Sequence, residues 1–399
     1  EIVNSDWSSD VCSSDLFKLL FICSFSYDDK CVAPLISPPP IEGKTLRFVQ
    51  VLTRHGARAP LNPFLPKKNR GYWLCDSDDA IASRVYTSPL NNDRHFHQIL
   101  DRDLVDYQPN CKSGDLLLKG MTQHQRLGEF YHKYLFDNHK LFDKLPVDPS
   151  DIYARCTDVE RTFRSAEGFL YGAFPVQSNN EIIDIVTDTS DCALLRTNAN
   201  WCPDLKEVSD KWYSSEECSN WVDEKWEIVK DMGRIMGITE KSPENLNSIC
   251  DFVTTHYCDD KRLPIEATEE VQQTCLNVSG SYIIDYYKSN SSVPASYTMR
   301  ELIRVADLHT STQKPKFSLM SSHDTTVTAA LIFLNENYEI YRIPPFASHL
   351  SMELWKSDND DDYTVRFALN GSPIPLSKID NQAEVSYKEF KNAYSAMND

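Results

Sequence analysis

Short hydrophobic runs and helical repeats alternate through the first half of the chain. Residues 46–52 are rich in β-branched and aromatic side chains and predict a strand. Apolar residues recur at helical spacing over 118–136, which predicts a helix. Residues 151–154 predict a second strand, and the helix expected over 159–173 begins with the capping-box pattern of residues 157–160. This order of elements is typical of an α/β fold.

The pattern changes over residues 205–290, where amphipathic repeats dominate. Their apolar faces predict three helices, at 222–236, 246–253 and 271–287. The block is also rich in tryptophan and glutamate. We interpret it as a helical cap inserted into the α/β fold.

Strand-like runs return near the end of the chain. Residues 316–320 predict a strand, and a helix is expected to follow at 327–334. Further strands are expected at 351–355 and 363–369. The α/β sheet core is therefore built from both ends of the chain.

The chain divides into a leader, a core and a cap. We assign residues 1–31 to the leader, 44–175 and 300–390 to the core, and 176–299 to the cap. Residues 5–16 resemble a translated sequencing-library adapter, so we expect the native start to be missing. Residues 17–25 resemble the end of the apolar segment of a signal peptide. The leader is therefore expected to be partly non-native and partly a signal-peptide remnant.

The acidic composition restricts the partners of the protein. Its 399 residues carry a formal net charge of −18. Nucleic-acid binders carry basic surfaces, so we expect no nucleic-acid partner. An anionic substrate would need a local cationic pocket in this acidic protein. No stretch approaches the roughly 18 apolar residues that span a membrane, so no transmembrane segment is expected.

The cysteines indicate an oxidising compartment. The chain has twelve, none of them in a CxxC pair. Scattered cysteines favour disulfides in a secreted or lysosomal protein. Glycosylation sequons at Asn277, Asn290 and Asn370 agree with that location.

Cysteine pairing and metal binding compete as explanations for part of the cap. Setting aside Cys12, Cys23 and Cys156 leaves nine of the twelve cysteines, and the odd number implies an unpaired thiol. His256 lies near Cys250 and Cys258 in a pattern that could bind zinc. We favour disulfide cysteines beside a histidine, and expect no metal and no cofactor.

Arginine and histidine cluster directly after the first predicted strand, in Arg54-His55-Gly56-Ala57-Arg58. Arginine binds phosphate oxygens with a planar fork of donors. A histidine between two arginines resists protonation, which keeps a ring nitrogen free to attack phosphorus. Gly56 permits a sharp turn or a close approach of a phosphate to the backbone. The alternative is a basic surface turn.

Two further strand ends carry similar chemistry. Arg155 precedes a helix N-terminus, where anions are favoured, although a structural salt bridge explains it equally well. His323 can bond a phosphate oxygen and Asp324 can protonate a departing alcohol, although such a pair before a helix is more often a cap. Because ligands bind outside the carboxyl ends of strands in open α/β sheets, we expect the three segments to converge.

Together these segments resemble the histidine acid phosphatases, branch 2 of the histidine phosphatase superfamily, and most closely its prostatic and lysosomal types. Residues 54–60 match the RHGxRxP signature, 116–123 resemble LxxxGxxQ, 155–162 resemble RSTDxxRT, and 322–326 resemble the distal HDT motif. The likeness runs from about residue 46 to 376 and is faint through the helical insert. It implies a phosphoglycerate-mutase-like, three-layer α/β core.

The resemblance also implies a role for each site residue. His55 would be the nucleophile that forms a phosphohistidine, and Asp324 the proton donor. Arg54, Arg58, Arg155 and His323 would bind the phosphoryl oxygens. Cys156 departs from the usual serine of the third motif. Because Asp324 must be protonated to act as an acid, an acidic pH optimum is predicted. The resemblance also suggests a homodimer.

Four other functions compete with an acid phosphatase acting on small phosphomonoesters or phosphoproteins. A phytase would use the same chemistry, but an acidic chain is poorly suited to a polyanion. A phosphoglycerate-type mutase disagrees with a secreted, disulfide-containing chain. A pseudo-phosphatase would bind phosphate without turnover, although every catalytic position is filled. Cysteine-based phosphatase chemistry needs Cys-x5-Arg, which the chain lacks.

Overall fold

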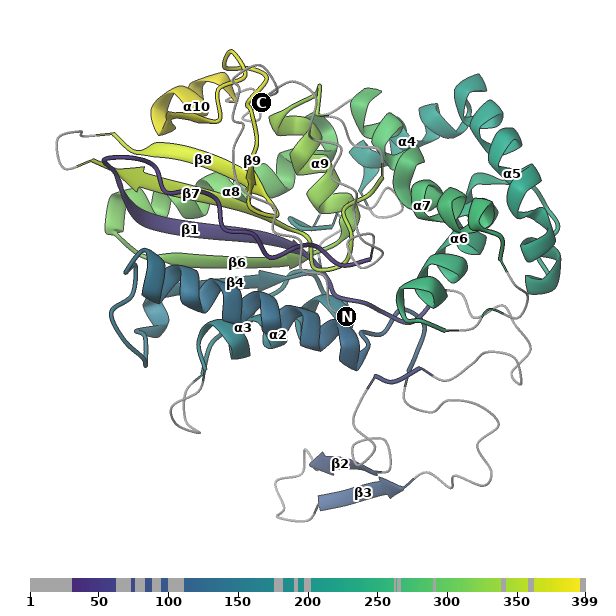
Figure 1. Cartoon of the computed structure of the whole chain (residues 1–399), viewed down its shortest axis with the longest axis horizontal. Helices are drawn as coiled ribbons and strands as arrows, with labels where there is room; N and C mark the ends of the chain where they lie inside the picture. Colours follow the sequence, from purple (N-terminus) through teal and green to yellow (C-terminus); the bar gives the residue numbers. More distant parts are fainter. Residues whose placement is uncertain are drawn as a thin grey trace, which may run out of the picture.

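A central sheet covered by helices on both faces forms the core of the computed structural model (Figure 1). The structure describes residues 31–61, 73–75, 83–87, 95–99, 111–175, 182–189, 193–196, 202–261, 263, 267–289, 292–338, 342–357 and 362–394. The strand order is β10-β8-β7-β1-β6-β4-β5, with β9 paired to β8. The predicted three-layer α/β core is confirmed.

The strands come from both ends of the chain. They are β1 (Thr45–Arg54), β4 (Ile152–Cys156), β5 (Ile185–Val186), β6 (Phe317–Ser322), β7 (His349–Lys356), β8 (Thr364–Leu369), β9 (Ser372–Pro373) and β10 (Glu384–Ser386). β1, β6, β4 and β5 run parallel, whereas β7 and β8 are antiparallel to their neighbours. The parallel strands therefore end at one edge of the sheet.

Helices form both outer layers and a group beside the sheet. They are α2 (Leu118–His132), α3 (Glu160–Ala173), α4 (Pro203–Tyr213), α5 (Glu216–Met236), α6 (Pro243–Cys258), α7 (Glu269–Ser289), α8 (Ser292–Thr312), α9 (Asp324–Leu334) and α10 (Tyr387–Ala393). Figure 1 shows α2 and α3 on one face of the sheet, α8, α9 and α10 on the other, and α5, α6 and α7 to one side.

The position of β1 in the middle of the sheet explains why its sequence is almost continuously apolar. Successive side chains of a strand point to opposite faces, and helices cover both faces here. Val49 and Val51 pack with α2 and α3, whereas Phe48 and Leu52 pack with α8 and α9. All four are fully buried, and burial of such a side chain contributes about 1.5–3 kcal/mol.

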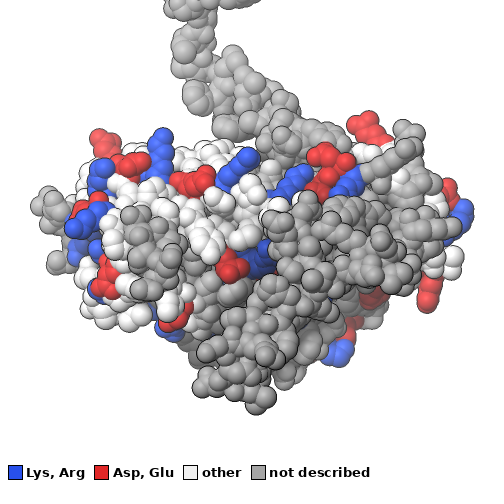
Figure 2. Space-filling view, turned by 90° about the horizontal axis from the view of Figure 1, so that it is seen from below, with Lys and Arg blue, Asp and Glu red and all other residues white. Residues whose placement is uncertain are grey.

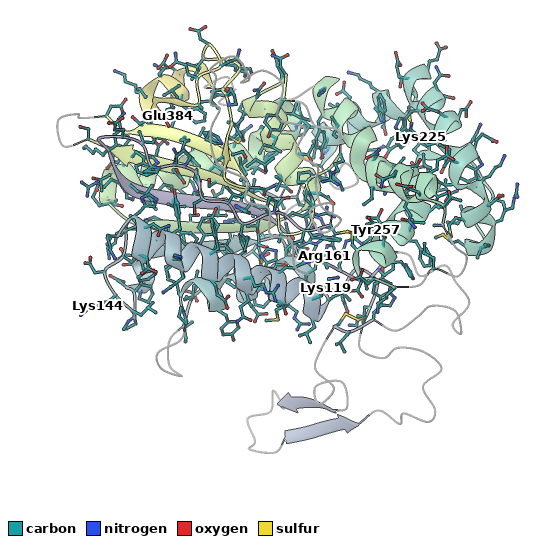
Figure 3. All side chains as sticks on the ribbon, viewed as in Figure 1. Lys119, Lys144, Arg161, Lys225, Tyr257 and Glu384 are labelled. Atoms are coloured by element: carbon teal, nitrogen blue, oxygen red, sulfur yellow. A yellow bond between two sulfur atoms is a disulfide. The ribbon has the colours of Figure 1, made fainter. Side chains whose placement is uncertain are left out.

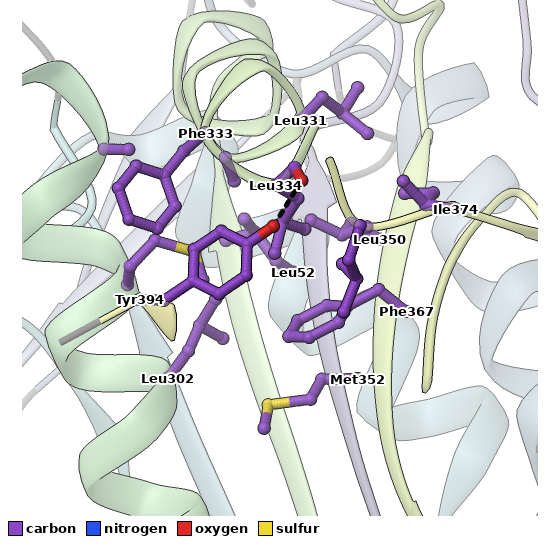
Figure 4. Packing of buried hydrophobic residues seen from close by; sticks show 14 of the residues in the cluster. Leu52, Leu302, Leu331, Phe333, Leu334, Leu350, Met352, Phe367, Ile374 and Tyr394 are labelled. Carbon is purple, nitrogen blue, oxygen red and sulfur yellow. Dashed lines mark hydrogen bonds between the residues drawn. The ribbon is translucent and has the colours of Figure 1, made fainter. Parts of the chain in front are cut away.

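The hydrophobic cluster that contains Phe48 and Leu52 also holds the end of the described chain in place. Tyr394, after α10, packs among Leu302, Phe333 and Leu334 (Figure 4). Its hydroxyl donates a hydrogen bond of 2.6 Å to the carbonyl of Leu334. The buried phenol therefore has the polar partner that it needs.

Most predicted elements lie within a few residues of their observed bounds, but three features differ. A hairpin of β2 (Ser83–Thr87) and β3 (His95–Ile99) was not predicted. The helix expected to reach residue 136 changes to a π-helix at Lys133–Asn138. The predicted capping box is wrong: Val159 is the N-cap of α3 and makes no side-chain cap.

The expected cap contributes its helices as one group with its own core. Trp226, Val229, Leu246 and Ile249 of α5 and α6 are among the buried residues of that core. The boundary expected between residues 299 and 300 falls inside α8. Because α8 packs against β1 and α9, it completes a face of the sheet.

Disulfides join parts of the chain that are distant in sequence. Cys31 pairs with Cys258 at the end of α6, and Cys75 pairs with Cys111. Cys258 therefore cannot ligate zinc beside His256, whose Nδ1 lies 2.7 Å from the Phe252 carbonyl. The free cysteines of the described residues are Cys156, Cys218, Cys250 and Cys275, so more thiols are unpaired than predicted. The described residues contain no group of His, Cys, Asp and Glu that could hold a metal.

No helix in the described parts of the chain has the length and apolar character needed to cross a membrane.

Loss of the Cys31–Cys258 crosslink should destabilise the fold. It closes a sequence separation of 227 residues, and such crosslinks stabilise by restricting the unfolded chain. We expect Cys31→Ser/Cys258→Ser to lower the free energy of unfolding by about 2–5 kcal/mol in denaturant titrations. Cys218→Ser, which changes a buried free thiol, is the control. An equal loss in the control would contradict a crosslink effect.

Candidate active site

The segment after β1 carries the first part of the candidate site and is held on every side. The amide of His55 donates to the Ser322 carbonyl at the end of β6, at 2.9 Å. The amide of Gly56 donates to Ser165 of α3 at 3.1 Å, and that of Ala57 to Gln123 of α2 at 2.8 Å. The sheet and both covering helices therefore fix the backbone on which His55 stands.

Gly56 is required by close packing of backbone against backbone. A Cβ at this position would lie 2.3 Å from the carbonyl oxygen of Gly120 in α2. At Gly120, a Cβ would in turn lie 2.2 Å from the carbonyl oxygen of Ala57. The glycines of the first two sequence motifs thus meet each other. Gly56 was expected to allow a sharp turn or the approach of a phosphate, and the close neighbour observed is the backbone of α2.

The parallel pairing of β1 with β6 brings the first and last motifs together. Arg54 is paired in register with Ser322, so His323 and Asp324 follow at the same edge. The rings of His55 and His323 lie 5.7 Å apart, and the Arg54 guanidinium forms a 2.9 Å ion pair with Asp324. Phe346 covers this pair, with its ring 4.3 Å from the Arg54 guanidinium carbon.

Arg155, expected in this cluster, lies elsewhere. Its guanidinium contacts Asp188 at 2.9 Å, Glu301 at 3.3 Å and the Tyr153 hydroxyl at 2.9 Å. Glu301 belongs to α8, so the side chain points to the α8 face of the sheet. The structural salt bridge considered from sequence is therefore the arrangement observed, and the expected grouping of Arg155 with His55 is corrected.

Arg161 occupies the place expected of Arg155. It lies in the first turn of α3, and its Nη2 is 3.4 Å from Nδ1 of His323. In Figure 3 it lies where the sheet faces α6. A sequence signal for it exists: a cation at a helix N-terminus opposes the helix dipole, so Arg161 is an unfavourable choice unless an anion compensates.

Asp251 of α6 is a further residue that sequence analysis missed. Its Oδ1 pairs with Nη2 of Arg58 at 2.7 Å, and its Oδ2 accepts the Leu61 amide at 2.8 Å. Asp251 lies among the apolar residues of α6, where a carboxylate needs a partner. A carboxylate among apolar residues could have been noticed in the sequence, but its partner, Arg58, could not have been identified there.

The three clustered arginines share one feature. Nε of Arg54, of Arg58 and of Arg161 is buried and has no hydrogen-bond partner among the described residues. Buried N–H donors are rarely left unsatisfied in native proteins. The cluster therefore holds three charged groups, each with a donor that no described residue accepts, and a bound oxyanion such as phosphate would compensate their charge.

Hydrogen bonding sets which nitrogen of His55 is free. Its Nδ1 lies 2.8 Å from the Gly56 carbonyl, which can only accept, so Nδ1 carries the proton. Burial, followed by the charges of Arg161, Arg54 and Arg58, lowers the pKa of His55 well below its ordinary value. The ring therefore stays neutral in mild acid, with a lone pair on Nε2.

Asp324, unlike the neutral His55, is ionised in the ligand-free site. Burial alone would raise the pKa of its carboxyl, but Arg54, Arg58 and His323 act against burial and the net pKa is lowered. Burial and then Arg161 hold the pKa of His323 well below its ordinary value. The resting cluster thus contains three arginines, two ionised carboxylates and two neutral histidines, so it has one net positive charge.

The cationic cluster contrasts with the surface around it. Figure 2 shows acidic and basic side chains interspersed over the described part of one face. No continuous basic patch is present on the described part of that face. With a formal net charge of −18 on the chain, the attraction of an anion has to come from the local cluster.

Comparison with known proteins agrees with this geometry. The family model of the histidine phosphatase superfamily (branch 2) matches residues 45–370. Counting factor 60 of Dictyostelium discoideum is 28% identical over 405 residues, covering 96% of this chain and 94% of that protein. Lysosomal acid phosphatase of Homo sapiens is 24% identical over 371 residues, covering 86% of this chain and 76% of that protein.

A solved structure supports the fold independently. Hafnia alvei phytase in complex with myo-inositol hexakis sulphate superposes with a TM-score of 0.60 at 13% identity. The match covers 90% of this chain and 98% of the phytase. At this identity the likeness shows the architecture alone.

The two arginines of the third motif should differ in their effect on anion binding. Arg161→Gln removes one of the three charged groups, and we expect the Kd for inorganic phosphate to rise by about 10- to 100-fold. Arg155→Gln leaves those groups in place and should change the Kd by less than about threefold. Isothermal titration calorimetry measures both. A larger effect of Arg155→Gln would restore the assignment made from sequence.

Proposed function

The chain belongs to branch 2 of the histidine phosphatase superfamily, and from this premise we propose that it is an acid phosphatase that hydrolyses phosphate monoesters through a phosphohistidine on His55. The observation that carries the proposal is the cluster of three buried guanidinium groups, each with an Nε donor that no described residue accepts, beside a neutral histidine. Such donors stabilise the charge that develops on the transferred phosphoryl group. Arg54, Arg58, Arg161 and His323 form this binding set.

The first step transfers the phosphoryl group to the protein. The lone pair on Nε2 of His55 attacks phosphorus, and the bond between phosphorus and the alcohol oxygen breaks. Asp324 gives its proton to that oxygen, so a neutral alcohol leaves. The Nδ1 proton, shared with the Gly56 carbonyl, keeps the ring oriented during the attack.

The second step releases phosphate. Water attacks the phosphorus of the phosphohistidine while Asp324, now ionised, takes a proton from it. The bond from phosphorus to Nε2 breaks and returns the lone pair to His55. One carboxyl thus serves as acid and then as base, as reversal of proton flow requires.

The proton on Asp324 must come with the substrate. In the ligand-free site this carboxyl is ionised and paired with Arg54. A phosphate monoester loses its second proton near pH 6, so below that pH it binds mainly as a monoanion. Transfer of that proton to Asp324 leaves a phosphoryl dianion on the arginines and a neutral carboxyl acid beside the leaving oxygen. An acidic pH optimum follows.

The location proposed for the protein is the secretory pathway, as a secreted or lysosomal enzyme. Disulfides such as Cys31–Cys258 are maintained in oxidising compartments. A relative named as a lysosomal acid phosphatase agrees with this location. Phytate and other polyanions are poorer candidates as substrates because two carboxylates already offset the charge of the cluster.

Trapping the intermediate tests the central step. Rapid acid quenching during turnover of a 32P-labelled phosphomonoester should leave label on the wild-type protein, and alkaline gels should retain it as phosphohistidine. His55→Ala should carry no label. His132→Ala, at a histidine of α2 that bonds the Ala173 carbonyl, should keep it. Label on His55→Ala would exclude this nucleophile, and binding without turnover would identify a pseudo-phosphatase.

The pH dependence tests Asp324. For an alkyl phosphate we expect wild-type kcat/KM to fall as pH rises above about 6, because the proton that Asp324 needs is then lost. Asp324→Asn should lower kcat by about 10²- to 10⁴-fold for this substrate. An aryl phosphate with an acidic phenol needs less protonation and should lose less. Equal losses for both leaving groups would exclude Asp324 as the acid.

A further inference from the structure

The contact between Asp251 and Arg58 joins the helical insertion to the site. Asp251 lies on α6, and its side chain is 10% exposed. Its two oxygens bind Nη2 of Arg58 and the amide of Leu61, both in the segment that follows β1. A buried carboxylate is costly unless it is paired and hydrogen-bonded, and these two donors supply that compensation.

The pairing fixes the orientation of the Arg58 guanidinium. Nη2 is held by Asp251 at 2.7 Å, and Nη1 donates to the Ala59 carbonyl at 3.2 Å. Nε has no partner among the described residues. The orientation of the guanidinium is therefore set by its two Nη contacts, while its charge is only partly compensated.

Helix α6 is anchored to the core independently of Arg58. Cys258 at its end is bonded to Cys31, and the Cys258 carbonyl accepts a 2.7 Å hydrogen bond from Lys119 of α2. Figure 3 shows Lys119 on the side of α2 that faces α6. Because α6 is held in place, the side chain of Asp251 has a fixed position, and a residue can orient another only from a fixed position.

We propose that Asp251 is a positioning residue, which orients the Arg58 guanidinium so that the insertion completes the phosphoryl-binding site. This inference rests on the function proposed above. Anion binding in the ground state needs mainly charge, whereas the transition state needs donors at defined positions. Loss of Asp251 should therefore reduce kcat while phosphate affinity is kept.

A double-mutant cycle tests the inference with p-nitrophenyl phosphate as substrate. Asp251→Asn should lower kcat by about tenfold, whereas the inhibition constant for inorganic phosphate should change by less than about threefold. In an Arg58→Gln background, Asp251→Asn should lower kcat by less than about twofold, because its target is gone. An unchanged kcat in the first comparison, or equal losses in both, would overturn the proposal.

Controls separate positioning from folding. Asp223→Asn removes an exposed carboxylate of α5 that pairs with Lys241, and it should leave kcat unchanged. Thermal unfolding of each variant identifies those that have lost structure. If Asp251→Asn fails to fold, Asp251→Glu takes its place: the carboxylate is kept but displaced by one methylene, and kcat should still fall.

A measurement without turnover distinguishes this inference from the proposed function. In 15N spectra of arginine-labelled protein, Arg58→Gln assigns the Nε–H signal of Arg58. Asp251→Asn should shift and broaden that signal, whereas Asp223→Asn should not. A wild type that lacks phosphatase activity but shows this change would refute the proposed function alone. An unchanged signal would refute the positioning role whether or not the enzyme is active.

Discussion

The parallel pairing of β1 with β6 is the interaction on which the site depends. Its register sets Arg54 opposite Ser322, so that His55 and the pair His323-Asp324 leave the sheet side by side. A shift of one residue would turn every side chain of a strand to the other face. Both faces of β1 are packed, Phe48 against α8 and α9 and Val49 against α2 and α3, so such a shift would place side chains of the wrong size in two close-packed layers. Core packing therefore fixes the geometry of the catalytic edge.

The cost of this arrangement is the burial of three like charges. Burial and the neighbouring Arg58 lower the pKa of Arg161 to about 10, yet the guanidinium remains charged at any working pH. Asp324 and Asp251 offset part of the repulsion, and carbonyls such as that of Pro344 bind part of the donor set. Burial, together with the remaining positive charge of the arginines, lowers the pKa of His55 and holds the ring neutral. The field that would bind a phosphate thus also favours the neutral ring that the proposed nucleophile needs.

The strands and the three motif segments could be predicted from sequence because they rest on local periodicity and on the rule that ligands bind at strand ends. The choice between Arg155 and Arg161 needed the structure, because the unfavourable helix position of Arg161 marks it as unusual but does not exclude Arg155 from the site. Both belong to one motif, and only the side-chain direction at the end of β4 sends Arg155 to Glu301. Asp251 could not be assigned because its partner is distant in sequence. Thr157, expected to cap α3, bonds His323 instead, so the site overrides a local preference.

Two carboxylates with similar contacts can serve different purposes because their surroundings differ. Asp324 and Asp251 each bind one arginine and one backbone amide. Asp324 begins α9 directly after His323, at the edge where the leaving oxygen would lie, so its proton can be exchanged with the substrate. Asp251 is held within α6 and faces an arginine that remains charged throughout the reaction. The proposed acid role of Asp324 requires a proton that can move. The proposed orienting role of Asp251 requires a charge that stays in place.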